Sequence, residues 1–222
     1  MNQSEICYIQ KIIEDKKRCD GRKFEENRPL RCVTNNETGI NKQVVVDNGQ
    51  SKLIIGITFT TRKEDVIYLE ENKYIYVSIF NLFIKKIALF LDKEHCSCHI
   101  KTEIIQNGGN LTELFLYGLK VAFHKFQLFD FKSKLICNTI NRRLIKSVSS
   151  KSIQLPEIRC YGLFLHGISQ FSLVRDPNIF EEDACNGFVI LIDTGVDTKI
   201  SIPKCNISEE IFKKILWYFN IQ

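Results

Sequence analysis

Several residue types are scarce in this sequence, and each scarcity excludes a class of protein. With 4 Pro and 11 Gly in 222 residues, the chain is neither collagen-like nor a low-complexity linker. Hydrophobic residues reach 44% and charged residues 26%, whereas disordered tails contain too few apolar residues to form a core. A run of about 20 apolar residues, enough to span a bilayer, is also missing, because Asn81, Lys85 and Lys86 interrupt the most apolar stretch, 74–91. We expect a folded protein without a membrane segment, with one large domain or two small ones.

Disulfide bonds are not expected to hold this fold. The nine cysteines are an odd number, and the first residues mix acidic and basic side chains without the apolar segment of a signal peptide. Both features argue against a secreted disulfide framework. We therefore expect a reducing compartment, in which the four Asn-x-Ser/Thr sites carry no glycans.

Basic residues are concentrated in the first two thirds of the chain. Residues 1–156 hold 25 Lys and Arg against 17 Asp and Glu, whereas residues 157–222 hold 6 against 9. The steepest excess lies in 120–151, where Asp130 is the single acid. Such an excess attracts phosphate backbones, but a solvated lysine-rich surface gives the same pattern. The charge alone leaves both interpretations open.

The pattern of apolar residues predicts a chain of mixed secondary structure. An amphipathic helix over 2–17 should begin with a capping box of Asn2 and Glu5. Asn48-Gly49 predicts a hairpin in which both residues have positive φ. Further helices are expected over 74–91, from Asn110 and from about Ser208. Strands are expected over 30–34, 43–46, 53–59, 96–105, 159–165, 171–174, 188–193 and 199–202. Because strands and helices do not alternate strictly, the fold class is α+β.

Three local clusters could carry chemistry, and each also has a structural explanation. The run 95–99, His-Cys-Ser-Cys-His, contains four possible metal ligands, but on a strand the cysteines and histidines face opposite sides, which favours buried thiols over zinc. Gly108-Gly109 before a helix could hold a phosphate, yet Glu113 already occupies the positive end of that helix. The acids within 176–183 suit a turn followed by a helix start better than paired catalytic carboxylates.

A series of short motifs extends over nearly the whole chain. The motifs are Asp20-Gly21-Arg22, Glu26, Arg28-Pro29-Leu30, Glu94-His95-Cys96, Gly108-Gly109-Asn110-Leu111, Asp176 and Glu181-Glu182-Asp183-Ala184-Cys185. Each motif is weak alone, but in this order the set resembles the RNase PH family, and within it the ring subunits of the eukaryotic RNA exosome.

The resemblance implies an RNase PH-like fold of two βα subdomains with a short N-terminal helix. Its expected parts are an N-terminal helical arm over 1–18, a first RNase PH-like domain over 19–156 and a second over 157–222. It also implies a six-membered ring of paired RNase PH-like subunits around a channel for single-stranded RNA. The expected partners are other ring subunits, RNA-binding cap subunits, RNA and an associated exoribonuclease, in the nucleus with its nucleolus and in the cytoplasm.

The chain departs from the catalytic members of the family that it resembles. In phosphorolytic relatives, an arginine beside the Gly-Gly turn grips phosphate and two aspartates support the chemistry. Here Leu111 follows Asn110 at the arginine position, Glu182 stands at the second aspartate position, and only Asp176 is retained. Because electrostatic stabilisation is usually the largest catalytic contribution, we expect Asn110, Leu111, Asp176 and Glu182 to form a degenerate former active site. The predicted protein is a non-catalytic ring scaffold without a cofactor or metal.

RNA contacts are expected at basic residues in or beside the predicted interface elements. The candidates are Lys73, Lys85, Lys86, Arg142 and Arg143. The helix over 74–91 lacks the Gly-Arg-Ser motif that holds RNA phosphates in the family, and the segment between Phe59 and Glu94 is shorter than the family pattern. Two alternatives stay open, an active phosphate-dependent 3′–5′ exoribonuclease and a stand-alone RNA-binding module.

Overall fold

The computed structural model describes residues 1–36, 41–60, 67–69, 87, 97–124, 155–167, 169–203 and 205–221. The expected helix over 74–91, apart from Ile87, and the basic segment 125–151 lie outside this range. None of the described helices is long and apolar enough to cross a membrane. In chain order the elements are α1 (Gln3–Glu14), β1 (Arg31–Asn36), β2 (Asn41–Asp47), β3 (Lys52–Thr60), β4 (Ile67–Leu69), β5 (Ser97–Gln106), α3 (Leu111–His124), β6 (Glu157–His166), β7 (Gln170–Arg175), α5 (Ile179–Ala184), β8 (Gly187–Asp193), β9 (Thr198–Ser201) and α6 (Glu209–Tyr218).

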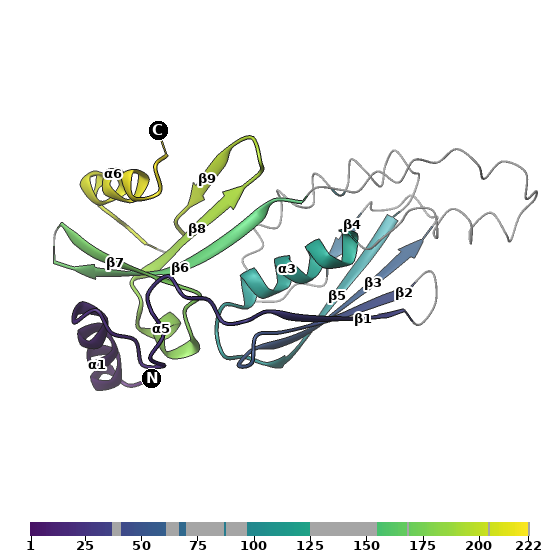
Figure 1. Cartoon of the computed structure of the whole chain (residues 1–222), viewed down its shortest axis with the longest axis horizontal. Helices are drawn as coiled ribbons and strands as arrows, with labels where there is room; N and C mark the ends of the chain where they lie inside the picture. Colours follow the sequence, from purple (N-terminus) through teal and green to yellow (C-terminus); the bar gives the residue numbers. More distant parts are fainter. Residues whose placement is uncertain are drawn as a thin grey trace, which may run out of the picture.

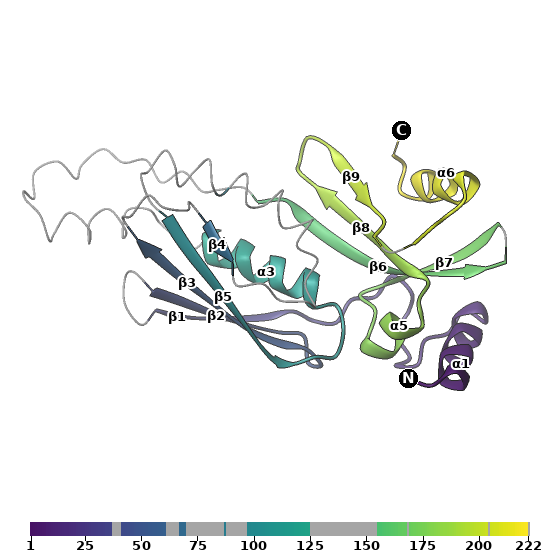
Figure 2. The ribbon, with the colours of Figure 1, turned by 180° about the vertical axis from the view of Figure 1, so that it is seen from behind.

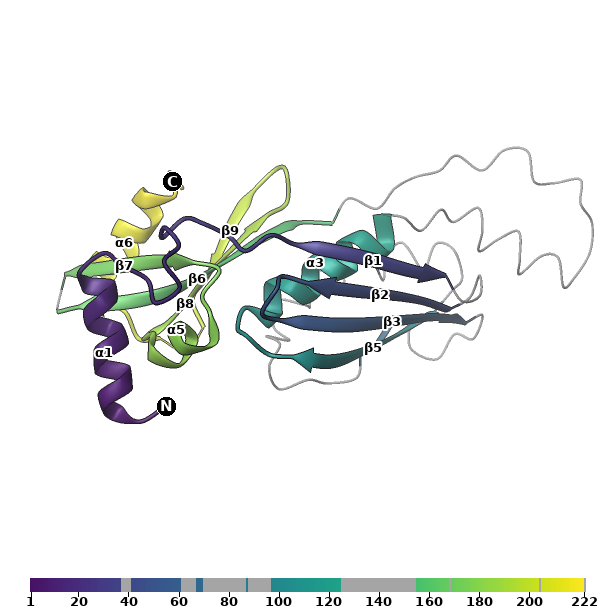
Figure 3. The same cartoon turned by 60° about the horizontal axis from the view of Figure 1, so that its bottom comes forward.

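The first sheet has the strand order β1-β2-β3-β5-β4 (Figure 3). Its strands pair antiparallel except for β4, which runs parallel to β5. The predicted hairpin between β2 and β3 is confirmed, but its expected geometry is wrong, because Gly49 has a φ of 87° whereas Asn48 has no positive φ. The Asn48 side chain instead accepts hydrogen bonds from the backbone N–H groups of Gln50 and Ser51. This side chain closes a four-residue loop in place of the predicted tight turn.

Helix α3 packs against the first sheet and also contacts the second (Figures 1 and 2). Its apolar positions recur at the helical period, and the core that they form includes residues of both sheets. A Cβ on Gly118 would lie 2.5 Å from Cδ1 of Ile55, so the helix approaches the sheet too closely for a larger residue. The buried helix residues are Leu111, Leu114, Phe115, Leu116, Leu119, Ala122 and Phe123. The strands of the two sheets fall on either side of Pro156, the expected domain boundary, while one core joins them.

The second sheet, in the order β7-β6-β8-β9, buries both of its faces. Tyr161 and Leu163 of β6 pack in a cluster with Ile211 and Ile215 of α6. Phe164 points to the opposite face, where it packs with Ile13 of α1. Helices α6 and α1 therefore cover this sheet from its two sides (Figure 1).

The N-terminal helix begins with the predicted capping box and docks on the second sheet and α5. The Asn2 side chain accepts a hydrogen bond from the Glu5 N–H, and the Glu5 carboxylate accepts one from the Asn2 N–H. Ile9 and Ile13 are buried, and the Gln10 amide donates to the carbonyl of Ala184 in α5. The helix thus fixes the position of α5, which carries part of the candidate site.

Candidate functional site

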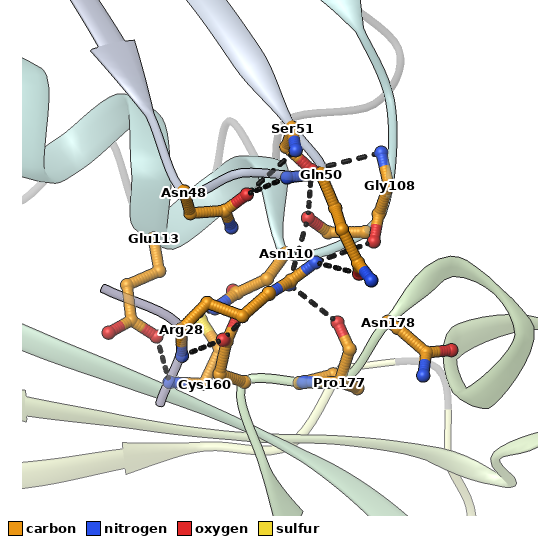
Figure 4. A network of polar contacts seen from close by, with 12 residues as sticks. Arg28, Asn48, Gln50, Ser51, Gly108, Asn110, Glu113, Cys160, Pro177 and Asn178 are labelled. Carbon is orange, nitrogen blue, oxygen red and sulfur yellow. Dashed lines mark hydrogen bonds and ion pairs between the residues drawn. The ribbon is translucent and has the colours of Figure 1, made fainter. Parts of the chain in front are cut away.

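The residues of the predicted degenerate site come together where the two sheets meet. The Gly108-Gly109 turn, which links β5 to α3, lies against the segment 176–179 that links β7 to α5. The N-terminal segment around Arg28 runs between them (Figure 4). Three segments that are far apart in the sequence therefore form one polar network.

Arg28 is the centre of this network. Its Nε and Nη2 donate to the two carboxylate oxygens of Asp176 at 2.8 and 2.6 Å. Its Nη1 donates to the Gln50 side chain and to the Gly108 carbonyl at 3.0 and 2.8 Å, and Nη2 also reaches the carbonyls of Gly109 and Pro177. A guanidinium has five N–H groups, and Arg28 uses them all within the protein. This buried cation therefore has no free donor for a phosphate ion.

Asp176 is held as an anion by the groups that surround it. Its carboxylate accepts hydrogen bonds from the Arg28 side chain, the Arg28 N–H, Arg22 and the Asn110 amide. Burial alone would raise the pKa of this carboxyl, but the hydrogen bonds and positive charge of Arg28 outweigh it and lower the pKa below the ordinary value. Asp176 thus serves as the anchor for two arginines.

The Gly-Gly turn is structural, as the sequence predicted. Gly109 has a φ of 93°, and a Cβ there would lie 2.6 Å from the backbone of Asn178, while a Cβ on Gly108 would lie 2.5 Å from the Gln50 carbonyl. The N–H groups of Gly108, Gly109 and Asn110 donate to Ser51 Oγ, Asn107 Oδ1 and Glu182 Oε1, respectively. A phosphate cradle needs free backbone N–H groups, and these three are all occupied.

Glu182 takes the position of an anion at the start of α3. Its Oε1 accepts the hydrogen bond of the Asn110 N–H at 2.6 Å. Burial raises the pKa of this carboxyl to about 7, against the lowering effects of the Asn110 N–H and the Arg28 charge. The raised pKa means that burial disfavours the negative charge of Glu182 more than the N-terminus of α3 favours it. A carboxyl oxygen of Glu182 thus occupies the start of α3.

Asn110 precedes α3, which begins here as expected, but its side chain does not cap the helix. Asn110 has a φ of 56°, and its side-chain nitrogen donates to Glu113 and Asp176 instead of the side-chain oxygen accepting an N–H of α3. Only 6% of the residue is exposed, and its Oδ1 has no hydrogen-bond partner among the described residues. The next residue, Leu111, is 4% exposed and belongs to the core of α3. The position that the resemblance assigns to a phosphate-binding arginine is therefore an apolar core position.

Two further buried ion pairs flank the network, and sequence reasoning missed both. Arg18 donates to both carboxylate oxygens of Glu181 at 2.9 and 2.7 Å, and neither side chain is exposed. Arg175 donates to both oxygens of Glu113 at 2.6 and 2.5 Å, and Glu113 also accepts the N–H of Cys160. Both pairs have the bidentate geometry of strong arginine–carboxylate contacts. In the sequence, Arg18 lies two residues before the Asp20-Gly21-Arg22 motif, and this position is the feature that could have marked it as part of the site.

The predicted RNA-contact residues lie outside the described part of the chain. They are Lys73, Lys85, Lys86, Arg142 and Arg143.

Of the possible metal ligands in 95–99, Cys98 is buried, and burial raises the pKa of its thiol to about 12. Within the described residues, no group of three or more His, Cys, Asp and Glu side chains is placed to hold a metal ion.

Comparisons with solved structures identify proteins with a similar fold. The chain matches no protein-family model and no curated protein sequence. It is similar to a chain of the Archaeoglobus fulgidus exosome with RNA bound to the active site, with a TM-score of 0.67 and 14% identity over 96% of this chain and 92% of that one. Rice (Oryza sativa) Rrp46 gives a TM-score of 0.57 at 13% identity, covering 90% and 91% of the two chains. A chain of an archaeal exosome core gives 0.56 at 15% identity, covering 96% and 90%.

These likenesses cover nearly the whole of each chain, so they include both sheets and the junction between them. They confirm the α+β fold class that the sequence predicted. The chain has the RNase PH-like fold of exosome core subunits.

Proposed function

We propose that this protein is a non-catalytic ring subunit of an RNA exosome. It would support 3′–5′ RNA processing and degradation, including rRNA maturation, by forming part of the RNA channel. The observation that carries the proposal is the likeness to exosome core subunits over more than nine tenths of both chains for the Archaeoglobus fulgidus subunit. The sequence motifs favour the ring position of ribosomal-RNA-processing protein 42 (exosome component 7), with pools in the nucleus, its nucleolus and the cytoplasm.

The lack of catalysis is proposed from the charges of the candidate site. Arg18, Arg22, Arg28 and Arg175 are each paired with a buried or half-buried carboxylate. Phosphorolysis must bring an anionic phosphate to an anionic RNA backbone, which needs cations aimed at the reacting groups. With these arginines committed to internal pairs and Glu182 at the start of α3, such a cationic grip is not built by the described residues.

One observation keeps the active exoribonuclease as the second candidate. The pKa of Glu182 is about 7, which is the range that suits a general acid near neutral pH. Asp176 and Glu182 both contact Asn110, so two carboxyl groups meet in the site. Incubating the purified full chain with single-stranded RNA and inorganic phosphate separates the two functions. Our proposal expects no nucleoside diphosphates, and their phosphate-dependent release would establish the enzyme instead.

The proposed assembly is tested by purification from the cells that produce the protein. A tagged full chain should co-purify with RNase PH-like ring subunits, RNA-binding cap subunits and an exoribonuclease, and the mass of the intact complex should fit a single copy of this chain. Recovery of a monomer that binds RNA alone would favour the stand-alone module.

The predicted RNA contacts are tested in the same complex. Arg142→Glu with Arg143→Glu should weaken protection of RNA by the assembled ring, because each change replaces a phosphate-attracting cation by an anion. The matched control is Lys213→Glu with Lys214→Glu, since these exposed lysines pair with Glu209 and Glu210 on α6. RNA protection that is equal in both double variants across salt concentrations would reject the assignment.

A further inference from the structure

A cavity of about 320 Å³ lies beside the Gly-Gly turn, separate from the ion pairs described above. It lies between the β2–β3 loop, the end of β5, the segment before Gly21 and the start of α5. The residues that matter for its chemistry are Cys19, Asp20, Gln50, Gln106, Asn107 and Phe180. Its volume is at the lower end of the range for small-molecule pockets, about 300–1,000 Å³. A single planar ring system therefore fits its size.

The polar groups of this cavity are mainly amide donors. The Gln50 Oε1 accepts a hydrogen bond from Arg28, and the Asn107 Oδ1 accepts one from the Gly109 N–H. These bonds use the oxygen of each amide and fix its orientation. The NH₂ groups of Gln50 and Asn107 donate no hydrogen bond to any described residue. Figure 4 shows the Gln50 side chain reaching past Gly108. The Gln106 amide makes no hydrogen bond with the described residues. The cavity thus offers unused donors to a ligand with oxygen or ring-nitrogen acceptors.

The charges around the cavity do not favour a phosphate. Among the described residues that line it, Asp20 alone is an acid. Burial would raise the pKa of Asp20, but hydrogen bonds from Arg22 and the charge of Arg18 overcome this effect and lower the pKa to about 2, so Asp20 is ionised. The Arg22 and Arg18 nitrogens lie 2.7 and 3.7 Å from its oxygens, so the negative charge is balanced. Among the described residues, no lysine or arginine lines the cavity. A neutral, polar ligand suits it better than an anion.

An exposed aromatic ring stands at this cavity. Phe180 is 56% exposed, although α5 buries its neighbours Glu181 and Ala184. Aromatic side chains stack on nucleobases, and this stacking tolerates any base because every base has a flat face. An aromatic ring, amide donors and a balanced charge can recognise a nucleobase with two acceptors on one edge, such as O2 and O4 of uracil or O6 and N7 of guanine.

We propose that this cavity binds one unstacked nucleobase of a single-stranded RNA, with Phe180 against its face and the amides of Gln50, Gln106 and Asn107 on its acceptor edge. The inference rests on the proposed function for the presence of RNA, and it adds a base-binding subsite with no phosphate contact. The sugar–phosphate backbone would stay at the open side of the cavity, where it remains solvated.

Cysteine alkylation gives a direct readout of this site. Cys19 lines the cavity and is exposed, whereas Cys7, also exposed, lies on α1 away from it. The full chain is treated with iodoacetamide alone, with hexauridylate or with uridine monophosphate, and the rates at both cysteines are followed by peptide mass spectrometry. At a concentration about nine times its Kd, hexauridylate should slow alkylation of Cys19 by about tenfold, because about a tenth of the sites stay free, and it should leave Cys7 unchanged.

Two variants link the protection to the proposed contacts. Phe180→Ala and Gln106→Leu should each abolish most of the protection, while Phe212→Ala, which removes a 40% exposed ring on α6, should not. Equal Cys19 rates with and without hexauridylate would overturn the subsite. Protection by the mononucleotide alone would overturn its assignment to an RNA strand. Neither result bears on the proposed function, which is tested by other readouts. It fails if the tagged chain recovers no ring partners, or if the chain releases nucleoside diphosphates from RNA in a phosphate-dependent way.

Discussion

Replacing Glu182 by Gln should make the protein more stable at alkaline pH than at acidic pH, relative to wild type. Burial raises the pKa of this carboxyl from 4.5 to about 7 in the folded chain. The folded protein therefore keeps a proton that the unfolded chain releases above pH 4.5, so the free energy of unfolding falls as the pH rises through this window. Above about pH 7 the folded chain releases the proton as well, and the loss is complete. Glutamine can still accept the Asn110 N–H and carries no charge to bury.

The expected size of this effect follows from the two pKa values. A difference between 4.5 and about 7 corresponds to roughly 3 kcal/mol, at about 1.4 kcal/mol per pKa unit. Glu182→Gln should thus raise the free energy of unfolding by roughly 2–3 kcal/mol at pH 8, and by less than about 1 kcal/mol at pH 5. Urea unfolding of both proteins at these two pH values, followed by circular dichroism, measures the difference.

The expected stabilisation depends on the burial of the Glu182 carboxyl, so the control is the same substitution at an exposed glutamate. Glu103→Gln removes the same charge from an exposed position on β5, so it should change stability little at either pH. A Glu182→Gln variant that is equally stable to wild type at pH 8, or less stable there than at pH 5, would refute the reasoning. Either outcome would mean that Glu182 is stabilised as an anion.

Three further changes test the network and the turns around it. Arg28→Ala should lower the free energy of unfolding by about 3–5 kcal/mol, because it leaves Asp176 buried without its main partner, whereas the exposed Arg31→Ala should cost little in urea unfolding. Gly109→Ala should destabilise clearly more than Gly21→Ala in thermal unfolding, since both have positive φ but only Gly109 faces backbone at 2.6 Å. Asn2→Ala should cost about 1 kcal/mol by removing the cap of α1, again read from urea unfolding.

The Asn-x-x-Glu patterns in the described chain show how far local sequence determines structure. Asn2 with Glu5 and Asn178 with Glu181 both form capping boxes. Asn110 stands three residues before Glu113 in the same pattern but forms none, because Arg175 and the Cys160 N–H bind the Glu113 carboxylate. Asn206 with Glu209 has the same pattern, but Ser208 is the N-cap of α6, so Asn206 forms no capping box. The local pattern therefore permits a capping box without ensuring one. At Asn110 a partner of Glu113 that is 62 residues away decides the outcome.

The secondary structure could be predicted because it depends on neighbours in the chain. The apolar period of α3, the β2–β3 hairpin and the turn role of Gly108-Gly109 all follow from residues within a few positions of one another. The ion pairs could not be predicted in this way, because Arg18 and Glu181 are 163 positions apart, and Arg28 and Asp176 are 148 apart. Sequence reasoning counts such residues as charges, and only the packing of the N-terminal segment between the sheets makes them buried partners.

The pairing of these charges also limits where RNA can be attracted. Arg18, Arg22, Arg28 and Arg175 are balanced by carboxylates within the junction, and a balanced cluster exerts little force on a phosphate beyond about 8–10 Å at physiological salt. The surplus of Lys and Arg over Asp and Glu in 1–156 must therefore act from other positions, and its steepest part is 120–151. Attraction of the RNA backbone and recognition of a base would then belong to different surfaces. Under this division, raising the salt concentration should weaken overall RNA affinity while changing protection of Cys19 at saturating RNA much less.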